Sequence, residues 1–370
     1  MPSLPGARAD ARCTRRRRRL AVTGGIGERS RRAASGAEAG PSGRRDPADV
    51  DSSDRAPADE DRADRAPATV GAALCAGAAR LAASARWQRG DLDAADAKGD
   101  ARALLAGLLG VEPRDLPARA RAPLGQADAG RFMALVAGRC QGAPVSRLLG
   151  QRGFWTLDLA VGPATLDPRP DSETLVEAAL AALPDRAAPL RVLDLGTGTG
   201  CLLLALLSER PAASGWGIDL AADAVAVARA NARSHGLAAR AHFAQGDFRR
   251  PDLGPPDDPA WDLAARFDVV LTNPPYIPSG DIAGLAPEVS AHDPRLALDG
   301  GDDGLAAYRA LALTLPAVLA DAGWAFIELG DGQAEAVAAC MAAAGMHVIG
   351  TRPDLGARQR CLLLRAPRAR

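Results

Sequence analysis

The chain has 370 residues, 47% of them hydrophobic, with 45 Lys plus Arg balanced by 45 Asp plus Glu. A chain of this length can hold two or three domains and bury a full core in at least one of them. Because the formal net charge is zero, a protein that coats nucleic acid is disfavoured, although a local basic patch is not excluded.

Cysteine and histidine spacing argues against disulfides and metals. The six cysteines form no Cys-x-x-Cys pair, and none of the four histidines pairs at metal-ligand spacing, so neither a disulfide framework nor a metal site is predicted. No run of about 18 apolar residues is present, so no membrane span is predicted. We expect a monomer in the reducing cytoplasm, with no membrane partner.

Residues 1–67 are rich in Arg, Asp, Ala, Gly, Ser and Pro and have no hydrophobic periodicity. Too little apolar surface is available there to offset the entropy of ordering, so a disordered tail is predicted. The Arg15–Arg19 run could contact RNA, but a solvated tail, or a translation start assigned too far upstream, is the preferred interpretation.

Residues 68–150 are predicted to form a small helical substrate-recognition domain. Two sets of side chains recur there at helical spacing, namely Leu104, Leu105, Leu108 and Leu109, and then Phe132, Leu135, Val136 and Arg139. Residues 151–173 are predicted to be a β-hairpin linker, because Phe154–Val161 alternates like a strand and Gly162-Pro163 follows as a turn.

Residues 174–370 alternate between strand and helix patterns. Apolar runs end in polar turns at Arg191–Leu195, Gly215–Asp219, Ala241–Gln245, Phe267–Thr272, Trp324–Leu329, Met346–Ile349 and Cys361–Leu364. Helical patterns such as Cys201–Ser208 and Ala222–His235 lie between them. This alternation predicts a doubly wound α/β sheet, which binds ligands at the carboxyl ends of its strands.

A glycine-rich loop follows the first of these strands. Gly196-Thr197-Gly198-Thr199-Gly200 leads directly into a helix, and glycine lets the backbone approach a ligand with no Cβ in the way. A nicotinamide fingerprint would place its third glycine at position 201, where Cys201 stands. The spacing favours a ligand made of a nucleoside and an amino acid, although a purely structural turn is the alternative.

Acidic residues end the next two strands. Asp219 lies about 20 residues past the glycines, where a carboxylate can accept both ribose hydroxyls, or can instead cap the following helix as its neighbour Asp223 can. Asp247 could accept from an adenine amino group while Phe248 packs on the ring. Ordinary turn chemistry is the alternative for that pair.

The fourth strand ends in Asn273-Pro274-Pro275-Tyr276. Two prolines cannot continue a central strand, and they lock φ and remove two N–H donors. The turn therefore offers backbone carbonyls and the Asn273 side-chain carbonyl as acceptors, with the flat ring of Tyr276 beside them. Such groups suit a planar –NH2: two acceptors orient the nitrogen and favour the charge that develops on it during attack. A rigid Pro-Pro turn with no chemistry is the alternative.

These residues resemble a known family. Asn273–Tyr276 is similar to the signature of amino methyltransferases that act on adenine N6 or on protein glutamine. The segment Thr165–Glu173 resembles the Pro-Arg-Pro-x-Thr-Glu segment of the bacterial release factor glutamine methyltransferases, the HemK family, and Gly142–Gly150 followed by Phe154-Trp155 resembles their interdomain segment. The resemblance covers the chain from about Val70 to the C-terminus.

The sequence departs from the family pattern at two positions and in its tail. Asp167 stands where Ile is usual and puts a charge at an expected packing position, whereas Ser172 conservatively replaces Thr. The tail has no counterpart in the family. A sister family that methylates a ribosomal-protein glutamine usually has Pro-Arg-Ser in this segment, and Pro168-Arg169-Pro170 argues against it.

The resemblance implies a Rossmann-like class I methyltransferase with a mixed doubly wound seven-stranded sheet, and a helical N-terminal domain that contacts the substrate protein. It implies S-adenosylmethionine as donor and the glutamine of the release factors' Gly-Gly-Gln motif as acceptor. The residues implied around the donor are Gly196, Thr197, Gly198, Thr199, Gly200, Asp219, Asp247, Phe248 and Asn273. Asn273, Pro274, Pro275 and Tyr276 are implied as catalytic residues around the glutamine.

Three other functions remain open from the sequence. An N6-adenine methyltransferase would share Asn273–Tyr276 but needs a basic face, which the neutral net charge disfavours, so direct nucleic-acid binding is not expected. A ribosomal-protein glutamine methyltransferase and a catalytically silent binding protein are the others. Outside the motifs, Glu328 is assigned to packing or capping, and Arg169 to a salt bridge between domains, with a direct substrate contact as the alternative. Glu288 and Arg295 are candidates for ordering the loop after Tyr276, with a plain surface loop as the alternative.

Overall fold

The computed structural model describes residues 69–84, 94–250, 253 and 266–368. The chain divides into two compact units, with the boundary between Gln141 and Gly142. The predicted tail, residues 1–67, lies outside the described residues. Within those described, no helix has both the length and the apolar character needed to cross a lipid bilayer.

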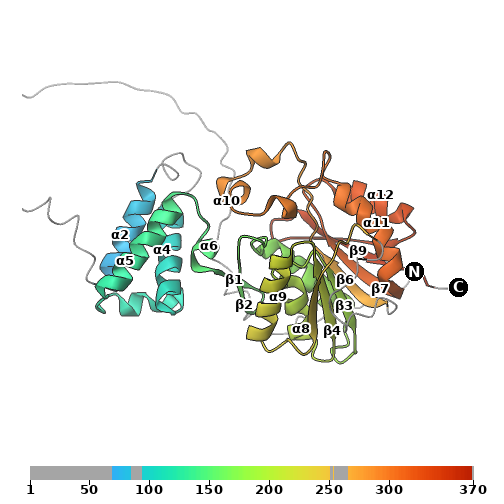
Figure 1. Cartoon of the computed structure of the whole chain (residues 1–370), viewed down its shortest axis with the longest axis horizontal. Coiled ribbons are helices and arrows are strands. Elements are labelled where there is room, and N and C mark those ends of the chain that lie inside the picture. The colour runs from blue at the N-terminus through green and yellow to red at the C-terminus, as the bar shows by residue number, and fades with distance from the viewer. Residues whose placement is uncertain (1–68, 85–93, 251–252, 254–265, 369–370) are drawn as a thin grey trace, which may run out of the picture. The chain divides into compact units, whose positions relative to one another are not determined.

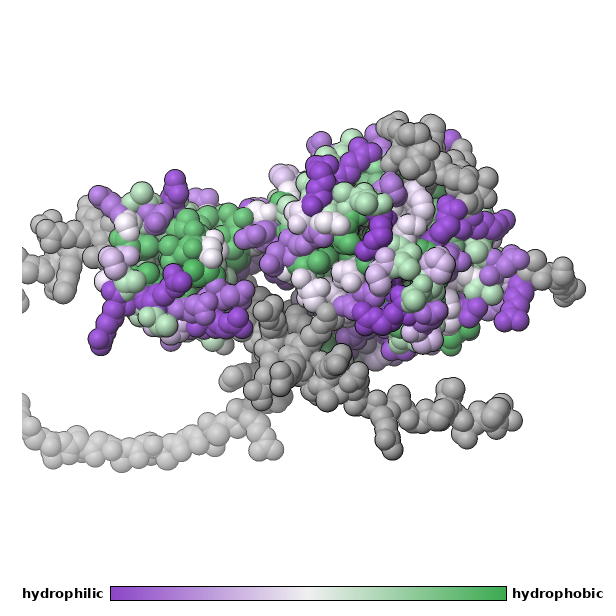
Figure 2. All heavy atoms as spheres, turned by 90° about the horizontal axis from the view of Figure 1, so that it is seen from below, coloured by the Kyte–Doolittle hydropathy of each residue, from purple (hydrophilic) through white to green (hydrophobic). Residues whose placement is uncertain are grey.

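Among its described residues, the first unit contains the α-helices α2 (Val70–Ala82), α4 (Ala94–Leu109) and α5 (Gln126–Cys140), and two short 3-10 helices at Pro113–Asp115 and Pro117–Arg119 (Figure 1). Helix α2 begins where the side chain of Thr69 accepts a hydrogen bond from the N–H of Ala72. The helices pack closely, since a Cβ at Gly77 would lie 2.6 Å from the ring of the buried Phe132. The helices expected from the leucine and phenylalanine spacing are confirmed, and Figure 2 shows apolar residues gathered on one face of this unit.

The second unit begins with helix α6 (Val145–Leu149) and a two-stranded hairpin, β1 (Gln151–Phe154) and β2 (Leu157–Ala160). The hairpin turn lies at Trp155–Thr156, so the predicted strand over Phe154–Val161 is interrupted there. The predicted turn at Gly162-Pro163 is confirmed as a separate turn after β2, in which the N–H of Thr165 donates to the carbonyl of Gly162 at 3.0 Å. Trp155 takes a left-handed φ of 59°. Glu173 holds it there by accepting from its N–H at 2.7 Å, which the strand alternation alone could not indicate.

A seven-stranded sheet forms the centre of the second unit. Its strands are β3 (Arg191–Leu195), β4 (Ser214–Asp219), β5 (Ala241–Gln245), β6 (Phe267–Thr272), β7 (Leu319–Glu328), β8 (His347–Pro353) and β9 (Gln359–Arg365). Their order is β5-β4-β3-β6-β7-β9-β8, and β9 runs antiparallel to both β7 and β8 while the pairs among the first five strands are parallel. The predicted mixed, doubly wound sheet is confirmed. Strand β7 begins five residues before the predicted Trp324, because a bulge opposite Phe267 and Val269 takes up the extra residues.

Helices cover both faces of the sheet (Figure 1). One hydrophobic cluster joins one face to α7 (Glu173–Ala182), α8 (Cys201–Glu209) and α9 (Ala222–Ser234), and the other joins the opposite face to α11 (Ala306–Val318) and α12 (Ala334–Ala343). All six residues Leu202–Leu207 of α8 are at most 3% exposed. Each buried leucine contributes about 1.5–3 kcal/mol, so α8 is fixed firmly behind the loop that precedes it.

Candidate active site

A cavity of about 300 Å³ lies at the carboxyl ends of β3, β4, β5 and β6. The predicted residues that line it are Gly196, Thr197, Gly198, Thr199, Asp219, Asp247, Phe248, Asn273 and Pro275. Apolar walls that the sequence did not indicate come from Leu166, Leu220, Pro294 and Leu296. Gly200, Pro274 and Tyr276 are not among the lining residues.

The neighbouring strand β4 holds the glycine loop in place through backbone hydrogen bonds. The N–H groups of Gly196 and Thr197 both donate to the carbonyl of Ile218, at 2.9 and 2.8 Å. Gly198 has a φ of +55°, and a Cβ added to it would meet no protein atom within 4 Å. The Cβ of a residue at Gly200 would instead crowd Leu204 at 3.2 Å. Gly198 thus borders free space, whereas Gly200 allows the loop to pack on α8.

Asp219 ties the loop to the second strand. Its Oδ2 accepts from the N–H of Gly198 at 2.8 Å, and its Oδ1 accepts from the N–H of Ala221 at 3.0 Å, just before α9. Burial raises the pKa of Asp219, while these backbone hydrogen bonds lower it. Each carboxylate oxygen has a second lone pair, so the side chain can hold the loop and still accept from a ligand in the cavity.

Asp247 and Phe248 follow β5 and differ in what they contact. The carboxylate of Asp247 forms a two-point ion pair with Arg249, with Nε–Oδ1 and Nη2–Oδ2 distances of 2.8 Å, and this hydrogen bonding lowers its pKa. The ring of Phe248 lies 3.6 Å from the position of a Cβ on Gly196. Phe248 therefore forms an apolar wall against the glycine loop, and Asp247 reaches the cavity already paired with a cation.

The backbone of Asn273–Tyr276 is enclosed by glycines and one glutamine. The amide of Gln333 donates to the Tyr276 carbonyl at 3.0 Å. A Cβ at Gly304 would lie 2.5 Å from that same carbonyl, and one at Gly300 would lie 2.9 Å from the carbonyl carbon of Tyr276. These close approaches fix the turn. The sequence offered a signal for them in Gly300-Gly301-Asp302-Asp303-Gly304, which the prediction did not use.

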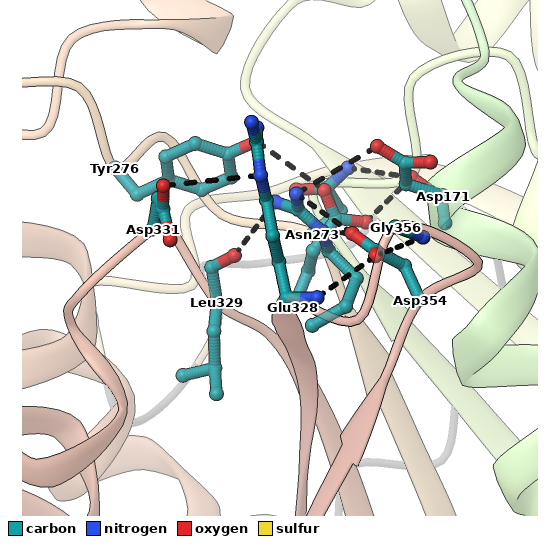
Figure 3. A network of polar contacts seen from close by, with 11 residues as sticks. Asp171, Asn273, Tyr276, Glu328, Leu329, Asp331, Asp354 and Gly356 are labelled. Atoms are coloured by element: carbon teal, nitrogen blue, oxygen red, sulfur yellow. Dashed lines mark hydrogen bonds and ion pairs between the residues drawn. The ribbon is translucent and has the colours of Figure 1, made fainter. Parts of the chain in front are cut away.

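A hydrogen-bonded chain connects this turn to two other segments (Figure 3). The amide Nδ2 of Asn273 donates to Ser172 Oγ at 3.2 Å. Ser172 Oγ lies 2.5 Å from Glu328 Oε2, and the hydroxyl of Tyr276 donates to Glu328 Oε1 at 3.4 Å. Ser172 and Glu328, predicted as a conservative replacement and a packing residue, thus contact the predicted catalytic residues.

The titratable groups around the cavity are strongly affected by burial. Burial raises the pKa of Glu328 to about 7, which the hydrogen bond from Ser172 and the charge of Arg360 oppose. Burial, and then the charge of Glu328, raise the pKa of Tyr276, so its phenol is a neutral donor. Burial also raises the pKa of Cys201 to about 12. Its neutral thiol is therefore a poor nucleophile.

Asp293 anchors the loop after Tyr276. Its side chain is 1% exposed and accepts from Arg147 Nη2 at 2.8 Å and from Arg169 Nη2 at 2.5 Å. The N–H of Asp167 also donates to it, at 3.3 Å, and Asp167 itself is buried. Arg295, which was predicted with Glu288 to order this loop, forms an ion pair with Asp299 at 2.9 Å. Asp293 in addition holds the end next to the cavity-lining Pro294.

We expect Asp293→Asn to lower the free energy of unfolding by about 3 kcal/mol, because it leaves Arg147 and Arg169 without a buried counter-charge. Urea unfolding would measure the change. The matched control is Asp303→Asn, which neutralises an exposed partner of Arg309 and should leave the midpoint nearly unchanged. Equal effects of the two substitutions would contradict the anchoring role.

Comparisons with known proteins identify relatives of this chain. Residues 187–297 match a methyltransferase domain family, and residues 84–150 match the PrmC N-terminal domain family. A release factor glutamine methyltransferase of Rhodospirillum rubrum is 49% identical over 72% of this chain and 78% of its own length. One from Agrobacterium fabrum is 39% identical over 80% of this chain and 97% of its own length.

Among solved structures, a release factor-specific protein-(glutamine-N5) methyltransferase of Alicyclobacillus acidocaldarius is 27% identical, with a TM-score of 0.33 over 56% of this chain and 99% of that chain. The assignment rests on the sequence relatives, whose matches span 93% and 97% of the length of two of them. The chain therefore belongs to the release factor glutamine methyltransferase family.

Proposed function

We propose that this protein transfers a methyl group from S-adenosylmethionine to the side-chain amide nitrogen of the glutamine in the Gly-Gly-Gln motif of peptide chain release factors. Membership of the family supports the substrate. The observation that carries the chemistry is the orientation of Asn273. Its Nδ2 is committed to Ser172, which leaves Oδ1 as an acceptor at the cavity beside the glycine loop.

The cavity fits the donor. The free space beside Gly198 accepts a ligand that runs against the backbone, Asp219 offers acceptors for ribose hydroxyls, and Phe248 offers an apolar wall for the adenine. Thr197, Thr199 and Asn273 complete the proposed donor site, with Asp247 at its rim. When bound, S-adenosylmethionine supplies a methyl group on a positively charged sulfur, which is the electrophile.

The turn after β6 orients the acceptor. The Oδ1 of Asn273 and the carbonyl of Pro274 accept the two hydrogens of the glutamine –NH2, and this supports the positive charge that develops on nitrogen as the new C–N bond forms. Amide nitrogens are poor nucleophiles, so alignment with the methyl group supplies the rest of the rate. No strong base is needed, because the surplus proton leaves to water after transfer. Pro275 and the Tyr276 ring are the proposed contacts on the flat faces of the amide.

The protein partner is proposed to contact the helical unit. The face of this unit seen in Figure 2 carries gathered apolar residues, a feature common at protein-binding surfaces. The PrmC N-terminal family match lies in the same region, at residues 84–150.

One experiment tests the substrate against its alternatives. The protein is incubated with donor labelled in the methyl group and, in separate reactions, with release factor, ribosomes or DNA. Label on the glutamine of the release factor is the expected result. Label on DNA would favour an N6-adenine methyltransferase, and label on a ribosomal protein would favour the sister activity.

The proposed ribose contact predicts that Asp219→Asn weakens binding of S-adenosylmethionine by about 10- to 100-fold, the effect of losing hydrogen bonds to a charged acceptor. Titration calorimetry measures the affinity. Asp223→Asn is the matched control, because Asp223 is an exposed residue in the first turn of α9 and should leave the affinity unchanged. An unaltered affinity in Asp219→Asn would argue that this carboxylate only holds the loop.

A further inference from the structure

Three segments far apart in the sequence meet at the wall of the candidate active site, where Ser172 and Asn273 both line the cavity. Ser172 precedes α7, Asn273 follows β6, and Glu328 ends β7. Asn273 and Ser172 are 101 residues apart, and Ser172 and Glu328 are 156 apart. Strands β6 and β7 are parallel neighbours, so their carboxyl ends bring Asn273 and Glu328 to the same edge of the sheet (Figure 3). Ser172 is hydrogen-bonded to both of them there.

The direction of the hydrogen bonds among Glu328, Ser172 and Asn273 follows from which of their atoms carry protons. An ionised Glu328 can only accept, so the hydroxyl of Ser172, 2.5 Å away, donates its single proton to Glu328. Ser172 Oγ then has only lone pairs to offer Asn273. The amide of Asn273 must present Nδ2 to Ser172, at 3.2 Å, and its Oδ1 is turned the other way.

We propose that Glu328 is a positioning residue that acts through Ser172 to hold the side-chain amide of Asn273 with its carbonyl toward the methyl acceptor. Tyr276 donates to the second oxygen of the same carboxylate, so Glu328 holds both ends of the Asn273–Tyr276 turn. This inference rests on the proposed function, because it assigns the carbonyl of Asn273 to the glutamine –NH2.

The surroundings of Glu328 allow it to change charge near neutral pH. Arg360 on β9 is the nearby cation, but its guanidinium is also bonded to Asp354 and to the carbonyl of Leu329. The other titratable groups that interact with Glu328 through charge or hydrogen bonding are Asp171, Tyr276, Tyr308 on α11, Cys201 on α8 and Cys361 on β9. Glu328 is 1% exposed, and this burial raises its pKa to about 7.

Protonation of Glu328 reverses the direction of the hydrogen bonds that link Glu328, Ser172 and Asn273. A protonated Glu328 can donate to Ser172 Oγ, which frees the serine proton to point at Asn273 and removes the preference for Nδ2 on that side. The ionised form is therefore the active form, and kcat should fall as pH decreases through about 7, the pKa of Glu328. A purely structural role for the carboxylate would not link turnover to its charge in this way.

The test compares variants with release factor as substrate, between pH 5.5 and 9. Glu328→Gln should lower kcat about 10- to 100-fold at pH 8, the usual cost of losing a group that orients a functional side chain, and its profile should lose the decrease near pH 7. Ser172→Ala should lower kcat by a similar factor, and Ser172→Thr should restore it because the hydroxyl returns. KM for release factor should stay within about twofold in all three, so the loss should be confined to kcat measured at saturating donor.

A matched control separates the chain from buried hydroxyls in general. Ser146 on α6 is 3% exposed, and its Oγ has no hydrogen-bond partner among the residues the structure describes. Ser146→Ala should therefore leave kcat and its pH profile as in the wild type. If Glu328→Gln does not fold, the Ser172 pair decides the question. Wild-type kcat in Ser172→Ala, or an unchanged low-pH decrease in a folded Glu328→Gln, would overturn the positioning role.

The same experiment distinguishes a failure of the proposed function from a failure of the positioning role. If the wild-type protein itself places no methyl group on the release factor glutamine, the substrate assignment is wrong whatever the variants do. If the wild type methylates that glutamine and the variants match it, only the positioning of Asn273 by Glu328 and Ser172 is wrong.

Discussion

Asn273→Ala should lower kcat for release factor methylation by a factor on the order of 10² to 10³, the cost of removing one preorganised polar group from a reaction centre. The contact between Oδ1 of Asn273 and the acceptor nitrogen strengthens as charge grows on that nitrogen. It therefore contributes mainly in the transition state and affects kcat more than binding. Single-turnover measurements at saturating donor would give the change directly, and affinity for the release factor should vary little.

Asn273→Asp is the sharper companion of that variant. It keeps the shape and an acceptor, but it replaces the Nδ2 donor with a second carboxylate that shares Ser172 with Glu328. Two carboxylates bonded to one hydroxyl repel each other, so the turn should lose its alignment and turnover should stay low. Binding of the positively charged donor could rise at the same time. Near wild-type kcat in Asn273→Ala would favour the interpretation of a rigid turn without chemistry.

Gly198→Val should weaken binding of S-adenosylmethionine by at least about 100-fold while the protein stays folded. Gly198 has a φ of +55°, and the direction of its missing Cβ leads into space that no protein atom fills within 4 Å. A valine side chain would occupy that space where the donor is proposed to lie against the backbone. The strain of a β-branched residue at positive φ should also cost about 1–3 kcal/mol of stability.

The strain and the loss of space can be separated. Gly236 has a similar φ of +68°, also with nothing within 4 Å, but it is exposed and is not among the residues that line the cavity. Gly236→Val should therefore reduce the thermal midpoint without changing donor affinity, while Gly198→Val changes both. Calorimetric titration with S-adenosylmethionine on both folded variants distinguishes them. Wild-type affinity in Gly198→Val would place the donor elsewhere.

Local patterns carried most of the fold prediction. The runs at Arg191–Leu195, Ala241–Gln245 and Phe267–Thr272 match β3, β5 and β6 residue for residue, because a buried strand bounded by polar turns is a short-range signal. The break in the predicted strand at Trp155 was missed, because the bend there is stabilised by the distant Glu173. Strand periodicity contains no information about such a partner.

The candidate active site likewise combines residues that the local sequence indicated and residues that only the fold brought together. The sequence by itself determined the glycine loop, the acid at the end of β4 and the Asn-Pro-Pro-Tyr turn, because each needs particular residues at fixed spacing within a few positions. Only the tertiary structure decided that Ser172 and Glu328 complete the turn and that Asp293 anchors the neighbouring loop. These side chains are brought together by the parallel order of β6 and β7 and by the packing of loops 100 or more residues away. Their bonds depend on burial and on which donor reaches which acceptor, and neither quantity is a property of a local stretch of chain.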